Sequence, residues 1–451
     1  LSIDGGDFVA HASSDGLLQA IEEGFPYPIK MMWIQSSNTL SCPGMDAARL
    51  YEAMQKIPFI VNADPYMTPT SVALADIVLP VAMSAERNSA RTWWTPARAM
   101  VKVADFYEAK SDEQIIVELG KRLNPEVFNQ WDSDIDWLDW YLREGSGSAF
   151  ATSEAADNAG IKSSGSTLFK HTWKELVEDP AMCGHAYDEF NASYNKAAKG
   201  LYRPDGSVGY GTPSGRLELT PMLYTYWGLS DTPFHVEPPE GPISTPELME
   251  TYPLILTCGG RSFEFFHSEH RQLPTMRELH PEPLVLVNPK TAEKYGVKDG
   301  QWIWIENDHG RFKQKVKLSP RVNEKTIHAE HGWWFPESKA EAPYLFGTFE
   351  SNPNNCTKAF VTGQGGVGSA IKSMICKIYP VEPGDKMPYE QIAETGNFPW
   401  YKKVNSPRQD EIDRFHKAMD AGMEYEVFSN ELFDPANNER FDLKTGARLA
   451  E

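Results

Sequence analysis

Apolar residues along the first 80 positions fall into three short runs separated by polar and helical segments. The runs are residues 29–34 (IKMMWI), 59–61 (FIV) and 77–79 (IVL). Between the first two runs, Asp46 precedes a set of apolar side chains at helical spacing, and its carboxylate can accept hydrogen bonds from a helical first turn. This set is Ala47, Leu50, Tyr51, Met54 and Ile57. Strand, amphipathic helix and strand together predict a right-handed βαβ unit with parallel strands.

Polar side chains follow the predicted strands at the positions where a parallel sheet binds nucleotides. Ser37 and Asn38 come after the first run, and Asp64 and Thr68 come after the second. In open α/β sheets, nucleotide-bearing cofactors lie at the carboxyl edge of the strands. The first loop lacks a G-x-G-x-x-G motif, however, and Ser37, Asn38 and Asp64 are also residue types that begin turns. Taken alone, these residues leave both a nucleotide site and a set of turns open.

Beyond a proline-dense segment between Asp231 and Pro253, the pattern changes to short runs of strand character. Apolar and polar side chains alternate in these runs, most strictly in residues 311–318 (RFKQKVKL). The predicted strands are residues 254–257, 284–287, 302–305, 311–318 and 326–329. Asn288 and Pro289 begin a short helix that glycine turns end. Several short strands with one short helix predict a small closed β-barrel.

Length, charge and cysteine content narrow the class of protein. A chain of 451 residues has room for roughly two to four domains. The formal net charge of −20 argues against nucleic acid or an anionic membrane surface as a partner, because both require a basic face. The five cysteines are never spaced Cys-x-x-Cys, so no disulfide framework, zinc site or iron–sulfur site is expected within this chain. The chain begins at Leu1 without a signal segment, and we expect it to be part of a longer polypeptide or a processed product.

Three stretches of the first part, in order, resemble the molybdopterin oxidoreductases of the dimethyl sulfoxide reductase family. They are residues 33–38 (WIQSSN), 62–70 (NADPYMTPT) and 75–80 (ADIVLP), followed by Glu86. In that family the equivalent loops hold the guanosine diphosphate arm of a molybdopterin guanine dinucleotide. Ser89 departs from the family pattern, which usually has glycine after the Glu.

The second part carries a further resemblance to the same family. Residues 260–268 (GRSFEFFHS) are similar to its pterin-contacting loop, with Arg261, His267 and Ser268 on the family's Arg, His and Ser/Thr positions. Forked cationic donors and small hydroxyl groups suit a fused pterin with a pyrophosphate tail. Two later positions, Asn355 and Lys372, are similar to further pterin contacts.

The resemblance implies an α/β fold, with a Rossmann-like parallel sheet lobe followed by a C-terminal double-psi β-barrel domain. It implies four parts. These are a guanine-dinucleotide-binding lobe at residues 1–120, a variable insert and linker at 121–245, a molybdopterin-dinucleotide-binding barrel at 246–385 and a tail at 386–451.

The resemblance also implies a cofactor, a molybdenum (or tungsten) bis-molybdopterin guanine dinucleotide used in oxygen-atom or two-electron transfer. The residues expected to bind it are Ser37, Asn38, Asp64, Thr68, Asp76, Arg261, His267, Ser268, Asn288, Asn355 and Lys372. The metal ligand and a 4Fe-4S cluster are expected upstream of Leu1, so no catalytic or metal-binding residue is predicted within this chain. Expected partners are the N-terminal half of the same polypeptide, an iron–sulfur electron-transfer subunit and a membrane anchor subunit. The sequence leaves the compartment open, between bacterial cytoplasm and periplasm.

Four alternatives stay open at this point. One is a structural subunit on the same scaffold that has lost its cofactor, and another is a non-redox hydratase or transhydroxylase of the family. A third is a nicotinamide-dependent dehydrogenase that uses the G-x-G-x-x-G motif at residues 363–368, which follows an apparent strand at residues 359–361 but lacks a crossover helix. The fourth is a metal pair of His328 and His331, which we do not expect because residues three apart on a strand point to opposite faces.

Two aromatic patterns complete the prediction. Trp131, Trp137 and Trp140 fall near helical spacing and are expected to pack a core. Apolar side chains in the tail predict one amphipathic helix over residues 409–424. They are Ile412, Phe415, Met419 and Met423.

Overall fold

The chain forms two compact units. The computed structural model describes residues 14–142 apart from 26, 43–44 and 92–97, residues 172–180, most of 194–232, residues 235–361 and 371–395, and short stretches between 405 and 448. Unit 1 comprises Leu1–Val78 and Pro233–Glu451, and unit 2 comprises Leu79–Thr232. The division at Leu79 lies within the segment 1–120, and residues 98–123 pack on helices that follow them in the chain. The later boundary at Pro233 falls within the proline-dense segment.

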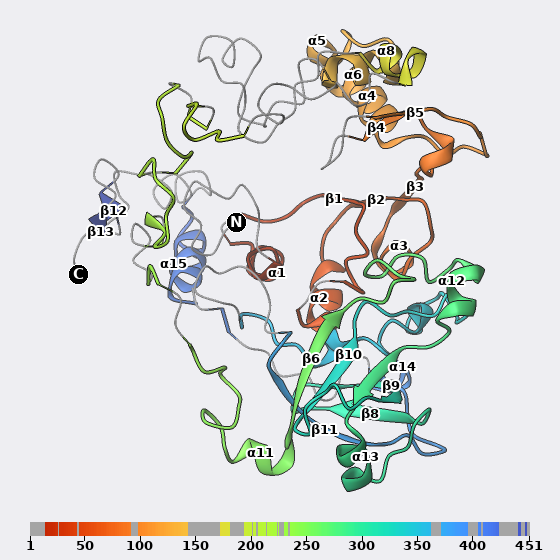
Figure 1. Cartoon of the computed structure of the whole chain (residues 1–451), viewed down its shortest axis with the longest axis vertical. Helices are drawn as coiled ribbons and strands as arrows, with labels where there is room; N and C mark the ends of the chain where they lie inside the picture. The colour runs from red at the N-terminus through yellow and green to blue at the C-terminus, as the bar shows by residue number, and fades with distance from the viewer. Residues whose placement is uncertain are drawn as a thin grey trace. The chain divides into compact units, whose positions relative to one another are not determined.

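The first part of unit 1 forms most of a three-stranded sheet in the order β1-β2-β3, whose last strand crosses the boundary into unit 2 (Figure 1). β1 (Met32–Gln35) and β2 (Ile60–Asp64) pair in parallel, with Trp33 opposite Val61, and β3 is Ile77–Pro80. Its helices are α1 (Ser14–Glu23), α2 (Ala47–Met54) and α3 (Pro69–Leu74). β1 begins three residues later than predicted, because its partner strand begins at Ile60, opposite Met32.

Two predicted helix starts are confirmed by side-chain caps. The Asp46 carboxylate accepts from the Arg49 N–H at 3.0 Å and begins α2. Asn288 caps α13 (Pro289–Tyr295), which ends at Gly296 in the left-handed region with φ 67°.

The second part of unit 1 is a closed six-stranded barrel, with strand order β10-β6-β11-β8-β9-β7. The strands are β6 (Leu254–Gly260), β7 (Leu284–Val287), β8 (Trp302–Glu306), β9 (Arg311–Leu318), β10 (Thr326–Glu330) and β11 (Met374–Pro380). β6 pairs with β10, and β7 with β9, in parallel; the other pairs are antiparallel. The predicted barrel and its first five strands are confirmed.

Short helices precede, connect and follow these strands. They are α11 (Leu248–Thr251), α12 (Pro274–Leu279), the 3-10 turns η4 (Leu345–Gly347) and η5 (Pro353–Cys356), α14 (Pro388–Thr395) and α15 (Gln409–Asp420). A final pair of two-residue strands comprises β12 (Phe441–Asp442) and β13 (Ala447–Arg448). Within the described residues, no helix is long and apolar enough to span a bilayer.

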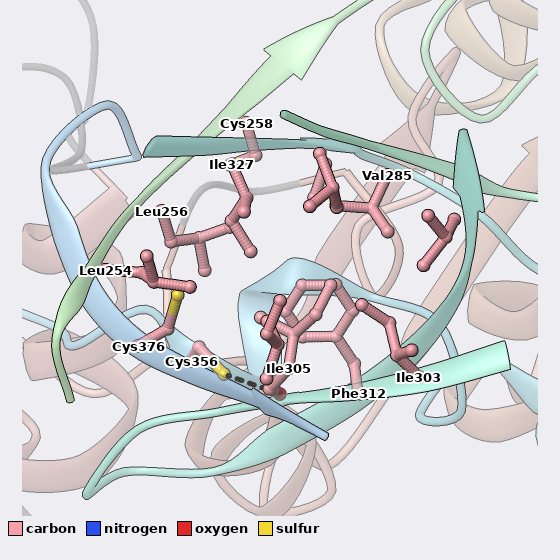
Figure 2. Close-up of a cluster of buried hydrophobic side chains, with 14 of the residues drawn as sticks. Leu254, Leu256, Cys258, Val285, Ile303, Ile305, Phe312, Ile327, Cys356 and Cys376 are labelled. Atoms are coloured by element: carbon pink, nitrogen blue, oxygen red, sulfur yellow. Dashed lines mark hydrogen bonds between the residues drawn. The ribbon is translucent and has the colours of Figure 1, made fainter. Parts of the chain in front are cut away.

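The barrel interior is filled by the inward-facing side chains of its strands (Figure 2). Leu256, Ile305 and Phe312 have no exposed surface, and each lies on a different strand. Three cysteines also lie in this core, where burial raises the pKa of the Cys258 thiol to about 12. Cys258, Cys356 and Cys376 are buried free thiols, whereas Cys42 is only partly buried.

Polar contacts join the sheet to the barrel within unit 1. The His309 Nε2 atom lies 2.8 Å from the Asp46 carboxylate, and both side chains are 2% exposed. A second contact joins the hydroxyls of Ser41 and Thr348 at 2.9 Å. Because Asp46 also caps α2, one carboxylate fixes the start of this helix against the hairpin between β8 and β9.

Unit 2 is mainly helical in its described part. Its elements are η1 (Ser84–Glu86), β4 (Ser89–Arg91), β5 (Arg98–Met100), α4 (Asp112–Leu123), α5 (Pro125–Phe128), α6 (Asp134–Trp140) and α8 (Trp173–Glu178). The tryptophans pack as predicted: the Trp131 and Trp140 rings lie 5.0 Å apart, and Trp137 stacks on Tyr141 at 5.1 Å.

Two sequence predictions are corrected. Residues 359–361 are not a strand, because Phe360 adopts φ 60° and turns the chain there. The strand context of the glycine-rich motif is thereby lost; the motif itself lies outside the described residues. The tail helix ends at Asp420, before Met423, because Gly422 takes a positive φ of 80°.

Candidate functional site

Asn38 and its neighbours occupy the carboxyl edge of the β1-β2-β3 sheet. Asn38 is 8% exposed, and its amide oxygen accepts from the Thr70 hydroxyl at 2.8 Å. Its amide nitrogen is buried and has no hydrogen-bond partner among the described residues. Buried donors without partners are rare in native proteins, so this amide nitrogen is available to a ligand or a water at this edge.

Asp64 ends β2 at the same edge and is nearly buried. Its carboxylate accepts from the Tyr66 N–H at 2.9 Å. Burial raises the pKa of Asp64 to about 6, and the nearby carboxylate of Glu269 adds to the rise, whereas the hydrogen bond from Tyr66 opposes it. Glu269 directly follows residues 260–268, which resemble the pterin-contacting loop, so the two predicted patches lie close together.

The barrel loop leaves β6 at Gly260 and turns sharply at His267, which has a positive φ of 53°. The Arg261 guanidinium lies over the Phe266 ring, 4.9 Å from its centre. The Ser268 carbonyl accepts from the Trp334 indole N–H at 2.8 Å. The segment after β10 therefore packs against this loop and holds it through this hydrogen bond.

A second set of contacts joins this loop to the sheet. The Cys42 thiol, in the loop after β1, is hydrogen bonded to Ser268, which partly offsets the rise in the Cys42 pKa caused by burial. Ser268 is 5% exposed. The residues on either side of this contact come from segments more than 200 positions apart, yet they form one surface.

Arg271 is a buried cation at the base of the loop. Its guanidinium lies 3.9 Å from the centre of the Phe265 ring and 4.4 Å from that of Trp333. It donates to the carbonyls of Glu269 and His331, both at 3.4 Å, and burial lowers the pKa of Arg271 to about 9. This cation–π arrangement ties the loop to the segment after β10.

The cavity at this loop is small. It has a volume of about 10 Å³ and is lined by Gly260, Arg261, Ser262, Phe265, His267, Arg271, Glu330 and His331. This is room for about one water, so a larger ligand lies against the loop rather than inside a preformed cavity. A larger hollow of about 300 Å³ lies elsewhere in unit 1, beside Tyr51, Pro343 and Ile392, and contains none of the predicted site residues.

The structure brings several predicted residues together: Asn38, Asp64, Arg261, His267, Ser268 and Lys372. Lys372 precedes β11 and donates to the Cys258 carbonyl at 2.6 Å, near the end of β6 from which the loop starts. Ser37 is exposed next to Asn38 and lies 3.2 Å from the Thr39 hydroxyl. Thr68 lies near Asp64, but its hydroxyl caps α3 in a capping box with Ser71.

Asp76 and Asn288 lie away from this cluster. The Asp76 carboxylate accepts from the Ile60 N–H at 2.7 Å, at the opposite end of β2 from Asp64. Asn288 caps α13 and donates to the Val322 carbonyl, so it is near the start of β10, whereas His331 follows its end. Both side chains have structural hydrogen bonds that account for their polar groups.

Asn355 also has a structural role. Its amide nitrogen donates to the carbonyls of Phe349 and Arg311, at 2.6 Å and 3.0 Å. Its amide oxygen is buried without a partner among the described residues, which leaves one acceptor for a ligand.

The structure adds Cys42, Glu269, Arg271 and His331 to the predicted site. His331 was visible in the sequence only as half of an implausible metal pair with His328. It follows the end of β10, and its Nε2 atom lies 2.8 Å from Nδ1 of His267. The described residues contain no group of three or more His, Cys, Asp or Glu side chains placed to hold a metal ion.

Gly332 lies in the segment after β10 and allows this segment to approach the loop closely. A larger residue at this position should move the segment away from the loop. A Cβ atom at this position, where φ is 68°, would lie 3.1 Å from the His267 carbonyl carbon and the Ser268 nitrogen. We expect Gly332→Ala to lower the free energy of unfolding by about 2–3 kcal/mol, from a strained φ and backbone contact. Gly296→Ala is the matched control, because Gly296 has φ 67° but open space around it, and should cost about 1 kcal/mol. If urea unfolding shows that Gly332→Ala and Gly296→Ala lower the free energy of unfolding equally, the close contact at Gly332 is refuted.

Comparisons with known proteins show which proteins this chain is similar to. Residues 254–374 match the molydopterin dinucleotide binding domain family. The chain is 32% identical over 379 residues to a dopamine dehydroxylase of Eggerthella lenta, covering 72% of this chain and 36% of that protein. It is 29% identical over 345 residues to an acetylene hydratase of Syntrophotalea acetylenica, covering 74% and 41%. It is 28% identical over 315 residues to a dimethyl sulfoxide/trimethylamine N-oxide reductase of Rhodobacter capsulatus, covering 66% and 35%.

A solved structure of one relative is also similar in fold to this chain. The structure of acetylene hydratase from Pelobacter acetylenicus matches with a TM-score of 0.66 and 26% identity, over 82% of this chain and 47% of that one. The chain therefore belongs to the molybdopterin oxidoreductase family. It spans less than half the length of each of these relatives.

Proposed function

We propose that this chain is the C-terminal part of a molybdenum enzyme and binds a bis-molybdopterin guanine dinucleotide. The observation that carries the proposal is the convergence of two distant segments. Asp64, at the carboxyl edge of the sheet, lies within electrostatic reach of Glu269, and Cys42 contacts Ser268. The edge that suits a nucleotide and the loop that suits a pterin thus form one surface. The match to a molydopterin dinucleotide binding domain supports a molybdenum–molybdopterin cofactor.

The residues present fit such a group. The orphaned amide nitrogen of Asn38 and the carboxylate of Asp64 offer a donor and an acceptor to the nucleotide arm. Arg261 and Lys372 would supply positive charge to its pyrophosphate, and His267 and Ser268 would contact its pterin. When bound, the cofactor supplies oxygen-atom or two-electron chemistry; these side chains orient it and set its surroundings.

Further parts of the proposal rest on the family alone. We place the metal ligand and a 4Fe-4S cluster in the N-terminal half of the polypeptide, with an iron–sulfur subunit and a membrane anchor as partners. Tungsten could replace molybdenum at the same site. We also propose the double-psi form for the barrel, and its two parallel strand pairs among antiparallel ones support this.

A second candidate is a non-redox member of the family, because two of the comparisons above are to acetylene hydratases. The two candidates differ in electron balance. An oxidoreductase turns over only with an electron donor or acceptor, whereas a hydratase needs neither. Turnover of the full-length protein without any redox partner would favour the second candidate.

The test of cofactor binding is the content of the full-length polypeptide as purified. We expect molybdenum or tungsten by elemental analysis and pterin fluorescence after oxidation. Arg261→Ala should lower the pterin content several-fold, whereas Lys386→Ala, which removes an exposed ion pair with Glu394 outside the predicted cofactor contacts, should not. A protein that contains neither metal nor pterin would instead be a structural subunit on the same scaffold.

A further inference from the structure

Two adjacent phenylalanines of the barrel loop lie in different surroundings. Phe265 is 5% exposed, its ring meets that of Trp333 at 5.4 Å between centres, and the Arg271 guanidinium lies over it. Phe266 is 52% exposed. Phe265 therefore anchors the loop in the core, whereas the Phe266 ring adds little to the core and lies at the surface.

The exposed Phe266 ring contacts two of the predicted cofactor-binding side chains. The Arg261 guanidinium lies over it, 4.9 Å from its centre, within the range of a cation–π contact. The His267 ring meets it edge-on, with 4.7 Å between ring centres and an angle of 82° between the planes. Within the described part of the chain, no hydrogen bond or ion pair fixes the Arg261 guanidinium, so the Phe266 ring is what orders it.

The backbone on both sides of Phe266 is fixed. The Phe266 carbonyl accepts from the Glu269 N–H at 2.9 Å, and His267 within this turn has a φ of 53°. On the other side, the buried ring of Phe265 holds the chain. The position of the Phe266 ring is therefore set by its neighbours in the chain and does not depend on its own burial.

We propose that Phe266 is a positioning residue, whose ring holds the Arg261 guanidinium and so presents its N–H groups to the pyrophosphate of the bound cofactor. The N–H groups of a guanidinium lie in its plane, so a contact with an aromatic face leaves them free for phosphate oxygens. Without the ring, a mobile arginine would have to be ordered on binding, which lowers affinity. The cofactor role rests on the proposed function, whereas the contact between the two side chains does not.

The contact is measurable by NMR without any ligand. Protons above an aromatic face resonate upfield, so in the ¹⁵N-arginine-labelled chain the Arg261 Nε–H signal should lie upfield of the ordinary arginine range. Arg261→Lys identifies this signal by removing it. Phe266→Leu keeps an apolar side chain without a ring and should return the signal to the ordinary range. An Arg261 signal that is the same in the unsubstituted and the Phe266→Leu chains would overturn the proposal.

Guanosine diphosphate is the probe for the role in binding, because it carries a pyrophosphate, and guanosine, which has none, is the matched control. From the strength of exposed cation–π contacts, Phe266→Leu should weaken binding of guanosine diphosphate by about two- to fivefold and leave guanosine binding unchanged. Phe266→Trp provides the best aromatic partner for a cation and should bind guanosine diphosphate at least as tightly as the unsubstituted chain. Equal affinities of the Leu and Trp variants for guanosine diphosphate would overturn the proposal.

A double variant separates positioning from general support of the loop. If Phe266 acts through Arg261, Phe266→Leu should have no further effect on guanosine diphosphate affinity in a chain that already carries Arg261→Ala. A further loss of affinity would overturn the proposal, because the ring would then act by another route. Phe266→Leu should also keep the urea midpoint of the unsubstituted chain, whereas Phe265→Leu, at the anchored position, should lower it. If Phe266→Leu does not fold, Phe266→Trp and the Arg261 signal of the unsubstituted chain decide.

These measurements distinguish the failure of this inference from the failure of the proposed function. If the unsubstituted and Phe266→Leu chains bind guanosine diphosphate equally well, only the role of Phe266 is rejected. If the full-length protein contains neither metal nor pterin, the proposed function is rejected together with the cofactor role of Phe266. The arginine spectrum still decides the contact between Phe266 and Arg261 in that case, because it requires no cofactor.

Discussion

Asp64→Asn should make the folded chain more stable at pH 7, by at most about 3 kcal/mol, while weakening the site. Burial raises the pKa of Asp64 to about 6, from 3.8. The folded state therefore holds a proton more tightly than the unfolded state, and stability decreases as the pH rises from about 4 to about 6. Above pH 6 the folded chain contains a buried carboxylate at a cost, and asparagine removes that cost. Its amide oxygen can still accept from the Tyr66 N–H.

The measurement is urea unfolding at pH 7 and at pH 3.5, where the gain should nearly vanish because Asp64 is mostly protonated in both states. Asp76→Ala is the matched control at the other end of β2. Asp76 accepts from the Ile60 N–H, so its loss should destabilise the chain by about 1–2 kcal/mol. Destabilisation by Asp64→Asn at pH 7 would contradict the unfavourable burial of its charge.

Asp64→Asn also tests whether the Asp64 carboxylate binds the nucleotide. Guanosine diphosphate, the nucleotide arm of the proposed cofactor, serves as the probe. A hydrogen bond to a charged acceptor contributes about 1.5–3 kcal/mol, so Asp64→Asn should weaken binding by roughly 10- to 100-fold. Asp76→Ala should leave the affinity of the folded chain unchanged. A stabilised variant with undiminished affinity would show that Asp64 is not a nucleotide ligand.

Asp46→Ala should give the largest destabilisation among the substitutions considered, about 4 kcal/mol. The Asp46 carboxylate has two roles: one oxygen caps α2 through the Arg49 N–H, and the other lies 2.8 Å from Nε2 of His309. Loss of an N-cap costs about 1 kcal/mol, and removal of one partner from a buried pair costs about 3–5 kcal/mol. Both side chains are 2% exposed, so solvent cannot replace the lost partner.

Urea unfolding at pH 7, followed by tryptophan fluorescence, measures this cost. Asp46→Asn keeps an oxygen for the cap and should cost about half as much. A double-mutant cycle with His309→Ala isolates the contact between α2 and the β8–β9 hairpin, and we expect a coupling of about 2 kcal/mol. If Asp46→Ala lowers the free energy of unfolding by only about 1 kcal/mol, the N-cap of α2 contributes to stability and the contact with His309 does not.

Local patterns predicted the elements of this fold well, because the forces that form them act over a few residues. The strict alternation of RFKQKVKL identified β9 with its observed ends, and Asp46 and Asn288 marked helix starts through their caps. The apparent strand at residues 359–361 failed because an apolar run does not reveal a left-handed turn such as that at Phe360.

The sequence predicted the candidate site only in part. The resemblance predicted Asp64, Arg261 and His267 together with Ser268. No local pattern indicated that the Asp76 carboxylate would instead accept from the Ile60 N–H, at the other end of β2 from Asp64. Cys42, a lone cysteine in a loop, carried no signal at all. Its relevance comes from the contact with Ser268, which depends on how the barrel packs against the sheet.

The sequence by itself determined the succession of strands and helices, the change from α/β to barrel, and the family to which the chain belongs. The tertiary structure decided which polar groups are used in caps and which remain available to a ligand. It also decided that His331 meets His267 and that Arg271 lies between Phe265 and Trp333. Periodicity records only the face that each element buries, whereas these contacts depend on the closure of the barrel and on the burial that accompanies it.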